Sequence, residues 1–245
     1  MPRFFINTSQ INDSSLYIEG DDSRHIARAL RMAVGDSITV CDENGTEYEA
    51  ELTKIRDDVC EACIISSSVS KSEPKQKITL FMAYPKGDKL ETVIQKAVEL
   101  GAHRIVPFES SRCIKRPAKD KAEQRTERLT KIAEAAAKQC GRASLPTVSI
   151  PISYKEAIKL GAEADLPIFC YEGNNAQSLK EVLKSNNGEI KTISVVIGSE
   201  GGFSQDEADY AAASGFRIAN LGPRILRCET APDYCLSAIS YEFEL

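Results

Sequence analysis

The chain has 245 residues, of which 42% are hydrophobic and 27% charged, and its formal net charge is −5. This length suits one large or two small domains, and the composition excludes fibrous and disordered proteins. No apolar run approaches the ~20 residues that cross a bilayer, and the first residues, MPRFFINTSQ, lack the apolar core of a signal peptide. We therefore expect a cytoplasmic protein with eight reduced cysteines and, with only two histidines, no metal site.

Residues 1–73 are predicted to form a small β-barrel domain. Asn44-Gly45 lies between two apolar segments and is a strong signal for a β-hairpin. Apolar residues at helical spacing predict one helix over Asp21–Met32. The expected strands are Arg3–Ile6, Leu16–Ile18, Ile38–Cys41, Glu47–Ile55 and Val59–Ser66.

Positive charge is sparse in this first domain, since residues 1–72 hold 7 basic against 13 acidic side chains. Arg24, Arg28 and Arg31 follow one another at i, i+4 and i+7, so a continuous helix would carry them on one face. Such a face either binds RNA, together with Arg3, or is simply solvated, and the sequence leaves both readings open.

A serine- and lysine-rich segment, SSSVSKSEPKQ at 66–76, is predicted to be a linker, so the second domain spans residues 74–245. From Lys77 onward strands and helices alternate, which predicts an α/β fold with a mostly parallel sheet and helices on both faces. The expected strands are Ile78–Tyr84, Arg104–Phe108, Leu166–Tyr171, Ile193–Ile197 and Phe216–Leu221. The expected helices include Asp88–Leu100, Asp120–Cys140 and Thr230–Phe243.

Residues 103–142 form the basic part of the chain, with 11 Lys and Arg against 5 acidic residues. Arg112, Lys115 and Arg116 crowd one loop of this segment, with Lys119 and Lys121 behind them. A local basic patch on an acidic protein favours a polyanionic partner over a loop that is merely solvated.

Two glycine-bearing loops follow the last two strands. The glycine loop, Gly198–Gly202, has three glycines in five positions, and Ser204 and Glu207 form a capping box for the next helix. It is either an ordinary turn or a place where backbone approaches a ligand. The arginine loop, residues 221–231, keeps Ile225 and Leu226 between two arginines, and apolar loop residues usually line a binding site. Thr230 is expected to cap the final helix.

The motifs IGSEGGFSQDE and LGPRILRCETA resemble the SPOUT-class, S-adenosylmethionine-dependent RNA methyltransferases. Within that class the chain is most similar to the family that methylates N3 of a uridine in small-subunit ribosomal RNA. KGD at 86–88, QKAVELG at 95–101, SSRC at 110–113 and QCGR at 139–142 fit the same family in the same order. The family usually has proline where this chain has Ser199 and threonine where it has Cys228.

The resemblance implies a PUA-like RNA-binding domain over 1–73 and a SPOUT methyltransferase domain with a trefoil knot over 74–245. It also implies S-adenosylmethionine as cofactor and ribosomal RNA, or the small ribosomal subunit, as partner. The expected cofactor-binding residues come from the two loops and from the loop after residue 170. They are Tyr171, Glu172, Ile197, Gly198, Glu200, Gly201, Gly202, Leu221, Gly222, Ile225, Leu226, Arg227 and Ala231.

Methylating an imide nitrogen requires a base or a cation that stabilises the anion. Arg227 is expected either to stabilise the uracil anion or to clamp a phosphate, and Glu200, Glu229 and Asp233 are the acids within the motif loops. Glu229 is equally well explained as a first-turn carboxylate of the final helix. The expected RNA contacts are Arg3, Arg24, Arg28, Arg31, Arg112, Lys115 and Arg116.

Other functions stay open on the sequence alone: a methyltransferase acting on another RNA position, such as a ribose 2′-hydroxyl, or a non-catalytic RNA-binding protein. The final helix carries an apolar stripe that includes Leu236, Ile239 and Phe243. The stripe packs either on the helix's own sheet or on a second copy of the chain. The resemblance favours a homodimer through this helix.

Overall fold

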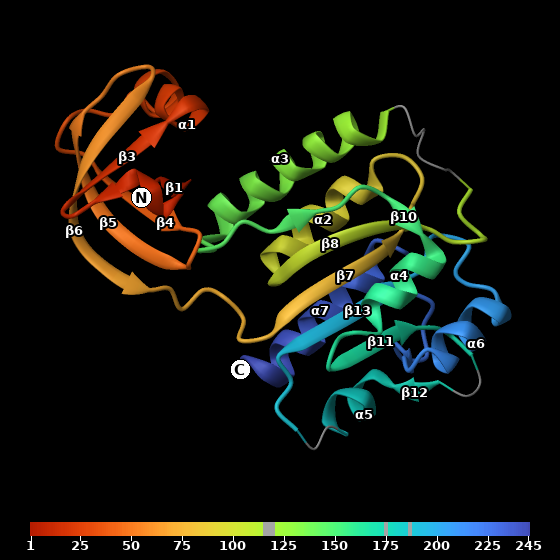
Figure 1. The fold of residues 1–245 in the computed structure, drawn as a ribbon. Helices are drawn as coiled ribbons and strands as arrows, with labels where there is room; N and C mark the ends of the chain where they lie inside the picture. The colour runs from red at the N-terminus through yellow and green to blue at the C-terminus, as the bar shows by residue number, and fades with distance from the viewer. Residues whose placement is uncertain (115–120, 174–175, 186–187) are drawn as a thin grey trace. The chain divides into compact units, whose positions relative to one another are not determined.

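The structure, a computed structural model, describes residues 1–114, 121–173, 176–185 and 188–245 (Figure 1). It divides into two compact units, residues 1–73 with 137–145, and residues 74–136 with 146–245. The segment 137–145 belongs to the first unit because its backbone and Arg142 surround Glu73. The Arg142 guanidinium donates to this carboxylate at 2.7 Å, and the Ala143 N–H donates at 2.9 Å. Domain limits of 1–73 and 74–245 stay a prediction.

The first unit is built on a six-stranded sheet, and all five predicted strands are confirmed. Buried apolar residues of the strands form its core, among them Leu16, Ile38 and Leu52. Neighbouring strands are antiparallel, except that β1 and β4 are parallel. In sheet order the strands are β1 (Arg3–Ile6), β4 (Ser37–Asp42), β5 (Thr46–Lys54), β6 (Val59–Val69), β3 (Ser15–Glu19) and β2 (Ile11–Asn12).

The predicted helix in this unit is shorter than expected. It comprises α1 (Gly20–Arg24) and one π-helical turn, His25–Ala29. It ends because Arg31 takes a left-handed backbone with φ of 51°, while the Met32 N–H donates to the Ile26 carbonyl at 3.2 Å. The prediction that Arg24, Arg28 and Arg31 share one helix face is therefore wrong. The predicted linker is also shorter, since β6 continues to Val69.

The second unit is an eight-stranded sheet in which every pairing is parallel. The predicted α/β class is confirmed, and the short strands β9, β10 and β12 were not predicted. In sheet order the strands are β10 (Ile152–Ser153), β8 (Ala102–Glu109), β7 (Lys77–Ala83), β13 (Thr192–Ile197), β11 (Leu166–Cys170), β14 (Arg217–Asn220) and β12 (Gln177–Ser178), and β9 (Thr147–Val148) pairs with β8. Threading as a knot stays a prediction.

Helices cover both faces of this sheet (Figure 1). The contacts between helices place α2, α5 and α7 together, and hydrogen bonding and ring contacts join α4 to α6. None of the helices in the described part of the chain has the length and apolar character of a transmembrane span. The helices are α2 (Lys89–Glu99), α3 (Ala122–Cys140), α4 (Tyr154–Gly161), α5 (Leu179–Lys184), α6 (Gln205–Ala213) and α7 (Thr230–Phe243).

The apolar stripe of α7 packs inside its own unit. Leu236 and Ile239 are 0% and 1% exposed, and α7 contacts α2, α5 and β13. The face of α7 that remains exposed carries Tyr234 and Tyr241, which are 46% and 73% exposed. The stripe predicted as a dimer surface is therefore used to bury the helix on the sheet.

Candidate active site

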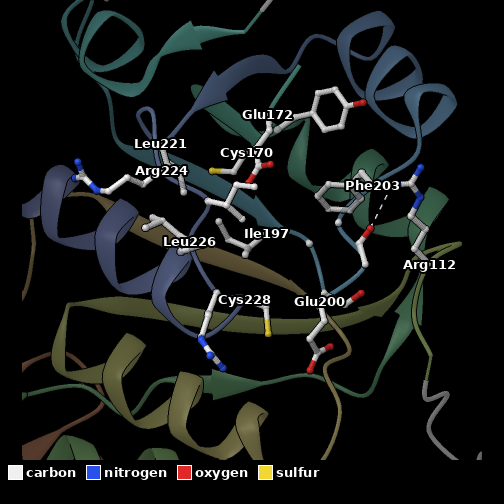
Figure 2. A pocket seen from close by; sticks show the side chains of 18 of the residues that line it. Arg112, Cys170, Glu172, Ile197, Glu200, Phe203, Leu221, Arg224, Leu226 and Cys228 are labelled. Atoms are coloured by element: carbon white, nitrogen blue, oxygen red, sulfur yellow. Dashed lines mark hydrogen bonds between the residues drawn. The ribbon is translucent and has the colours of Figure 1, made fainter. Parts of the chain in front are cut away.

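A cavity of about 580 Å³ lies where three strands of the parallel sheet end (Figure 2). Its walls are the loops that follow β11, β13 and β14, together with the start of α2 and of α7. In open parallel sheets, ligands bind at the carboxyl ends of the strands, where such loops meet. All thirteen residues expected from the sequence to bind the cofactor line this cavity. Their role as cofactor contacts stays a prediction.

The glycine loop is a tight turn that exposes bare backbone to the cavity. The Gly202 N–H donates to the Ser199 carbonyl at 2.9 Å, and Gly202 has a left-handed φ of 62°. A Cβ atom on Gly198 would approach the Gly202 Cα to 3.1 Å. Below the loop, the buried Phe203 ring packs on Phe169 with ring centroids 4.3 Å apart. The loop thus needs glycine at these positions in order to fold tightly.

Arg112, predicted as an RNA contact, packs directly against the glycine loop (Figure 2). Its guanidinium donates to the Gly201 carbonyl at 3.3 Å, and its side chain lines the cavity. A Cβ atom on Gly201 would lie 2.9 Å from both the Cβ and the carbonyl oxygen of Arg112. Gly201 is therefore required by the neighbouring segment and not by its own φ, which lies outside the left-handed region.

Glu207 joins the same two segments from below. The predicted capping box is confirmed: Glu207 Oε2 accepts the Ser204 N–H at 2.9 Å, and the Ser204 hydroxyl accepts the Glu207 N–H at 3.2 Å. The other oxygen, Oε1, accepts the Ser111 N–H at 2.7 Å. Glu207 is only 7% exposed, so this buried carboxylate ties the SSRC segment to the start of α6.

Lys89, which the sequence did not single out, connects the two cofactor loops. Its ammonium lies 3.0 Å from Glu200 Oε1 in the glycine loop and 3.3 Å from Glu229 Oε2 at the end of the arginine loop. The Lys86 N–H donates to Glu200 at 3.2 Å, and the Cys228 thiol donates to Glu229 at 3.1 Å. Two carboxylates, one ammonium and one thiol therefore form a single cluster at the edge of the cavity.

The cluster shifts the pKa of each of these groups. Burial raises the pKa of Glu200, but hydrogen bonds from backbone N–H groups and from Lys89 outweigh it and hold that pKa below its usual value. The Cys228 thiol, the backbone N–H of Glu229 and, to a smaller extent, Lys89 lower the pKa of Glu229. Burial, followed by the bond to Glu229, raises the pKa of Cys228 to about 12. Both carboxylates are ionised and the thiol is protonated at neutral pH.

The arginine loop presents side chains to solvent at the cavity mouth. Ile225 is 84% exposed, and Arg224 and Arg227 are exposed as well. In the part of the chain that the structure describes, no hydrogen bond or ion pair engages the Arg227 guanidinium. The expected cap at Thr230 is wrong: Glu229 is the residue before α7, its backbone is already helical, and no side chain caps the helix.

The remaining predicted RNA contacts are dispersed. Arg3 is largely buried and donates to Glu47 at 2.8 Å, so its charge is already paired. Arg24 and Arg28 form exposed ion pairs with Asp21 and Asp57. Lys115 and Arg116 lie outside the described residues.

The cavity also includes residues that the sequence did not predict as cofactor contacts, and these are Lys89, Arg112, Cys170, Ser199, Phe203, Arg224 and Cys228.

Comparison with known families now defines the class of protein. Residues 71–240 match the RNA methyltransferase domain family, and residues 18–62 match the RNA methyltransferase PUA domain family. The α/β unit that carries the cavity is thus an RNA methyltransferase domain, and the six-stranded sheet before it belongs to a PUA-like domain.

Relatives of the same kind cover the whole chain. The ribosomal RNA small subunit methyltransferase E of Bacillus subtilis is 36% identical over 251 residues, covering 100% of this chain and 98% of the relative. The solved structure of the Neisseria gonorrhoeae enzyme of that name, bound to S-adenosylmethionine, has a TM-score of 0.83 at 30% identity, covering 98% of this chain and 97% of that one. The structure of a putative methyltransferase from Legionella pneumophila, also bound to S-adenosylmethionine, has a TM-score of 0.84 at 26% identity, covering 98% of this chain and 96% of that one. The chain belongs to the ribosomal RNA small subunit methyltransferase E family.

Proposed function

We propose that this protein transfers a methyl group from S-adenosylmethionine to N3 of a uridine in small-subunit ribosomal RNA. The observation that carries the proposal is the cavity in which three loops meet at the carboxyl ends of β11, β13 and β14, the last two of which carry the family's motifs. A cytoplasmic location follows from such a substrate.

The cavity suits the proposed donor in size and chemistry. A volume of about 580 Å³ falls within the range of cofactor pockets. Gly198 and Gly201 leave backbone groups bare, which the adenine and ribose need as hydrogen-bond partners, while Ile197, Leu221 and Leu226 supply apolar walls. The bound donor supplies an electrophilic methyl group on a sulfonium, and the protein's task is to orient it toward the base.

Arg227 is our candidate to stabilise the uracil anion, since the residue lines the cavity and its guanidinium has no recorded partner within the described residues; Arg224 shares both properties. Glu200 and Glu229 are poor candidates for the general base. A base is most effective when its pKa lies near the working pH, and both carboxylates have lowered pKa values and contact Lys89. We therefore assign the two glutamates to the architecture of the site and Arg227 to the chemistry.

The alternatives differ in measurable ways. Nucleoside analysis of ribosomal RNA from a strain lacking this protein should show loss of N3-methyluridine, restored by the wild-type gene and not by Arg227→Ala. Loss of a ribose methylation instead would support a 2′-hydroxyl as the acceptor. An unchanged nucleoside profile, together with no binding of S-adenosylmethionine in calorimetry, would support a non-catalytic RNA-binding protein.

We also propose that the protein forms a homodimer through the exposed face of α7. Tyr234 and Tyr241 lie two turns apart on this face, with the small Ser237 and Ala238 between them. Two exposed tyrosines on one helix suit a protein interface, because each ring combines a large apolar area with a polar hydroxyl. The opposite stripe, with Leu236 and Ile239, is used within the chain and is not available for pairing.

A further inference from the structure

Lys89 is the first residue of α2, yet its side chain lines the cofactor cavity. The same ammonium is within 3.3 Å of carboxylates from two loops, Glu200 after β13 and Glu229 before α7. The long separation of these residues along the chain means that only the folded site brings them together. No other side chain in the described part of the chain is recorded as paired with both loops.

The position of Lys89 is unfavourable for the helix that carries it. The first turn of a helix has unsatisfied N–H groups and partial positive charge, so a cation there is destabilising. Lys96, in the last turn of the same helix, has the position that the helix dipole favours. The two carboxylate partners of Lys89 therefore offset the unfavourable interaction of its charge with the helix dipole.

We propose that Lys89 is a positioning residue for methyl transfer: it joins the glycine loop to the arginine loop through Glu200 and Glu229, and so fixes one wall of the cofactor cavity. The inference rests on the proposed function only in taking this cavity as the site of S-adenosylmethionine. It concerns how the loops are held and not which nucleotide is methylated.

The other contacts of the cluster support this role. Each carboxylate is held on one side by a neighbour, Glu200 by the Lys86 N–H and Glu229 by the Cys228 thiol, and on the other side by Lys89. Without the ammonium, two negative charges would face each other across the gap between the loops. Their repulsion would separate the loops, since like charges at short range favour larger distances.

The titration of the two carboxylates offers a readout that a purely structural lysine would not change. Lys89, Cys228 and backbone N–H groups keep the pKa values of Glu200 and Glu229 low, while burial of Glu200 acts in the opposite direction. Lowered pKa values keep both groups ionised until the pH falls well into the acid range. When Lys89 is removed, both pKa values rise, so the carboxylates lose their charge at a higher pH.

The test is the affinity for S-adenosylmethionine, measured by calorimetry across a pH series without RNA, for Lys89→Met, Lys89→Arg and Lys96→Met. We expect Lys89→Met to weaken binding by about threefold to thirtyfold at neutral pH, from the loss of two ion pairs. The acid limb of its binding profile should differ from that of the wild type: protonation of the two carboxylates breaks the bridge in the wild type but relieves their repulsion in Lys89→Met, so the loss of affinity should shrink as the pH falls. Lys89→Arg should restore most of both properties, because a guanidinium can bridge two carboxylates.

Lys96→Met is the matched control, because Lys96 also joins α2 to α7, through Asp233 at 3.0 Å, but outside the cavity. Asp233 is the main cause of its raised pKa, and Glu229 is only a minor one. This variant should leave the affinity for the donor unchanged, or nearly so. A Lys89→Met protein with wild-type affinity and a wild-type acid limb would overturn the proposal.

If Lys89→Met does not fold, as judged by its thermal midpoint, Glu229→Gln decides the question by removing one end of the bridge. Weaker donor binding supports the bridge, and unchanged affinity refutes it. Failure of the proposed function looks different, since the wild-type protein itself would then not bind S-adenosylmethionine.

Discussion

Gly201→Ala places a single methyl group where two segments of the methyltransferase domain meet. The new Cβ would lie 2.9 Å from the Cβ of Arg112 and 2.9 Å from its carbonyl oxygen. Neither atom is the end of a flexible side chain, so one of the two segments must move. Contact at a normal separation of ~3.5 Å requires a shift of about 0.6 Å.

The free-energy cost of the substitution depends on how strongly the two segments resist this shift. The Ser111 N–H is bonded to the buried Glu207 carboxylate at 2.7 Å, and the Arg112 guanidinium is bonded to the Gly201 carbonyl at 3.3 Å. Forcing an extra methyl group into a packed site costs about 1–3 kcal/mol. If the loop moves in the free protein and must return when the donor binds, this cost weakens donor affinity by about fivefold to 150-fold. If the loop cannot move, the same cost lowers the stability of the fold.

The assay therefore measures the affinity for S-adenosylmethionine and the thermal midpoint on the same sample. Gly188→Ala is the control, because Gly188 is exposed, its new Cβ would meet no atom of the described residues within 4 Å, and its φ lies outside the left-handed region. We expect Gly201→Ala to change at least one quantity and Gly188→Ala to change neither. Wild-type affinity together with a wild-type midpoint for Gly201→Ala would refute the reasoning from packing.

Three further predictions use the same site and the final helix. Glu207→Gln should lower the thermal midpoint and weaken binding of the methyl donor; the free energies lost from folding and from binding should add up to about 1.5–3 kcal/mol, the value of a hydrogen bond to a charged group. Glu156→Gln, in the exposed capping box of α4, is the control and should cost less, and equal effects of the two variants would contradict a special role for Glu207. Arg112→Gln should weaken binding of the methyl donor as well as binding of RNA. Unchanged affinity for the methyl donor in calorimetry would exclude a role for Arg112 in the cofactor cavity. The Tyr241→Asp variant should sediment as a monomer where the wild type is a dimer, whereas Ile239→Asp should unfold the protein. A Tyr241→Asp variant that is still a dimer would exclude the exposed face of α7 as the dimer interface.

Features with a local signal were predictable from the sequence. The capping box at Ser204 and Glu207 was recognised because its two partners are three residues apart. The strands before the cofactor loops were recognised because a buried parallel strand is a continuous apolar run that ends in glycine. These signals located thirteen of the twenty residues that line the cavity, since parallel strands bring their following loops to one edge of the sheet.

Features that depend on distant partners could not be predicted in this way. Lys89 lies 139 residues from Cys228, and nothing near Lys89 in the sequence distinguishes it from other helix-surface lysines. The apolar stripe of α7 showed that one face is buried but not what covers it. The end of the first helix also lacked a signal, because Arg31 takes the left-handed conformation usually left to glycine or asparagine.

The two departures from the family pattern have different consequences in the folded site. Serine in place of proline at 199 removes a rigid residue, but other contacts hold the glycine loop. From outside the loop, Arg112 donates to Gly201 and the Lys86 N–H donates to Glu200; within it, the Gly202 N–H donates to the Ser199 carbonyl. The loop therefore does not depend on proline for its shape. The Ser199 hydroxyl is buried and makes no hydrogen bond within the described residues, so it adds an unsatisfied polar group that proline would not.

Cysteine in place of threonine at 228 keeps a hydrogen-bond donor at this position. The Cys228 thiol donates to Glu229 at 3.1 Å, a bond that a threonine hydroxyl would also make and make more strongly. Because the pKa of this thiol is raised to about 12, it remains protonated and unreactive at neutral pH. The substitution thus preserves the position of Glu229, and through Glu229 the contact with Lys89, while the bond itself becomes weaker.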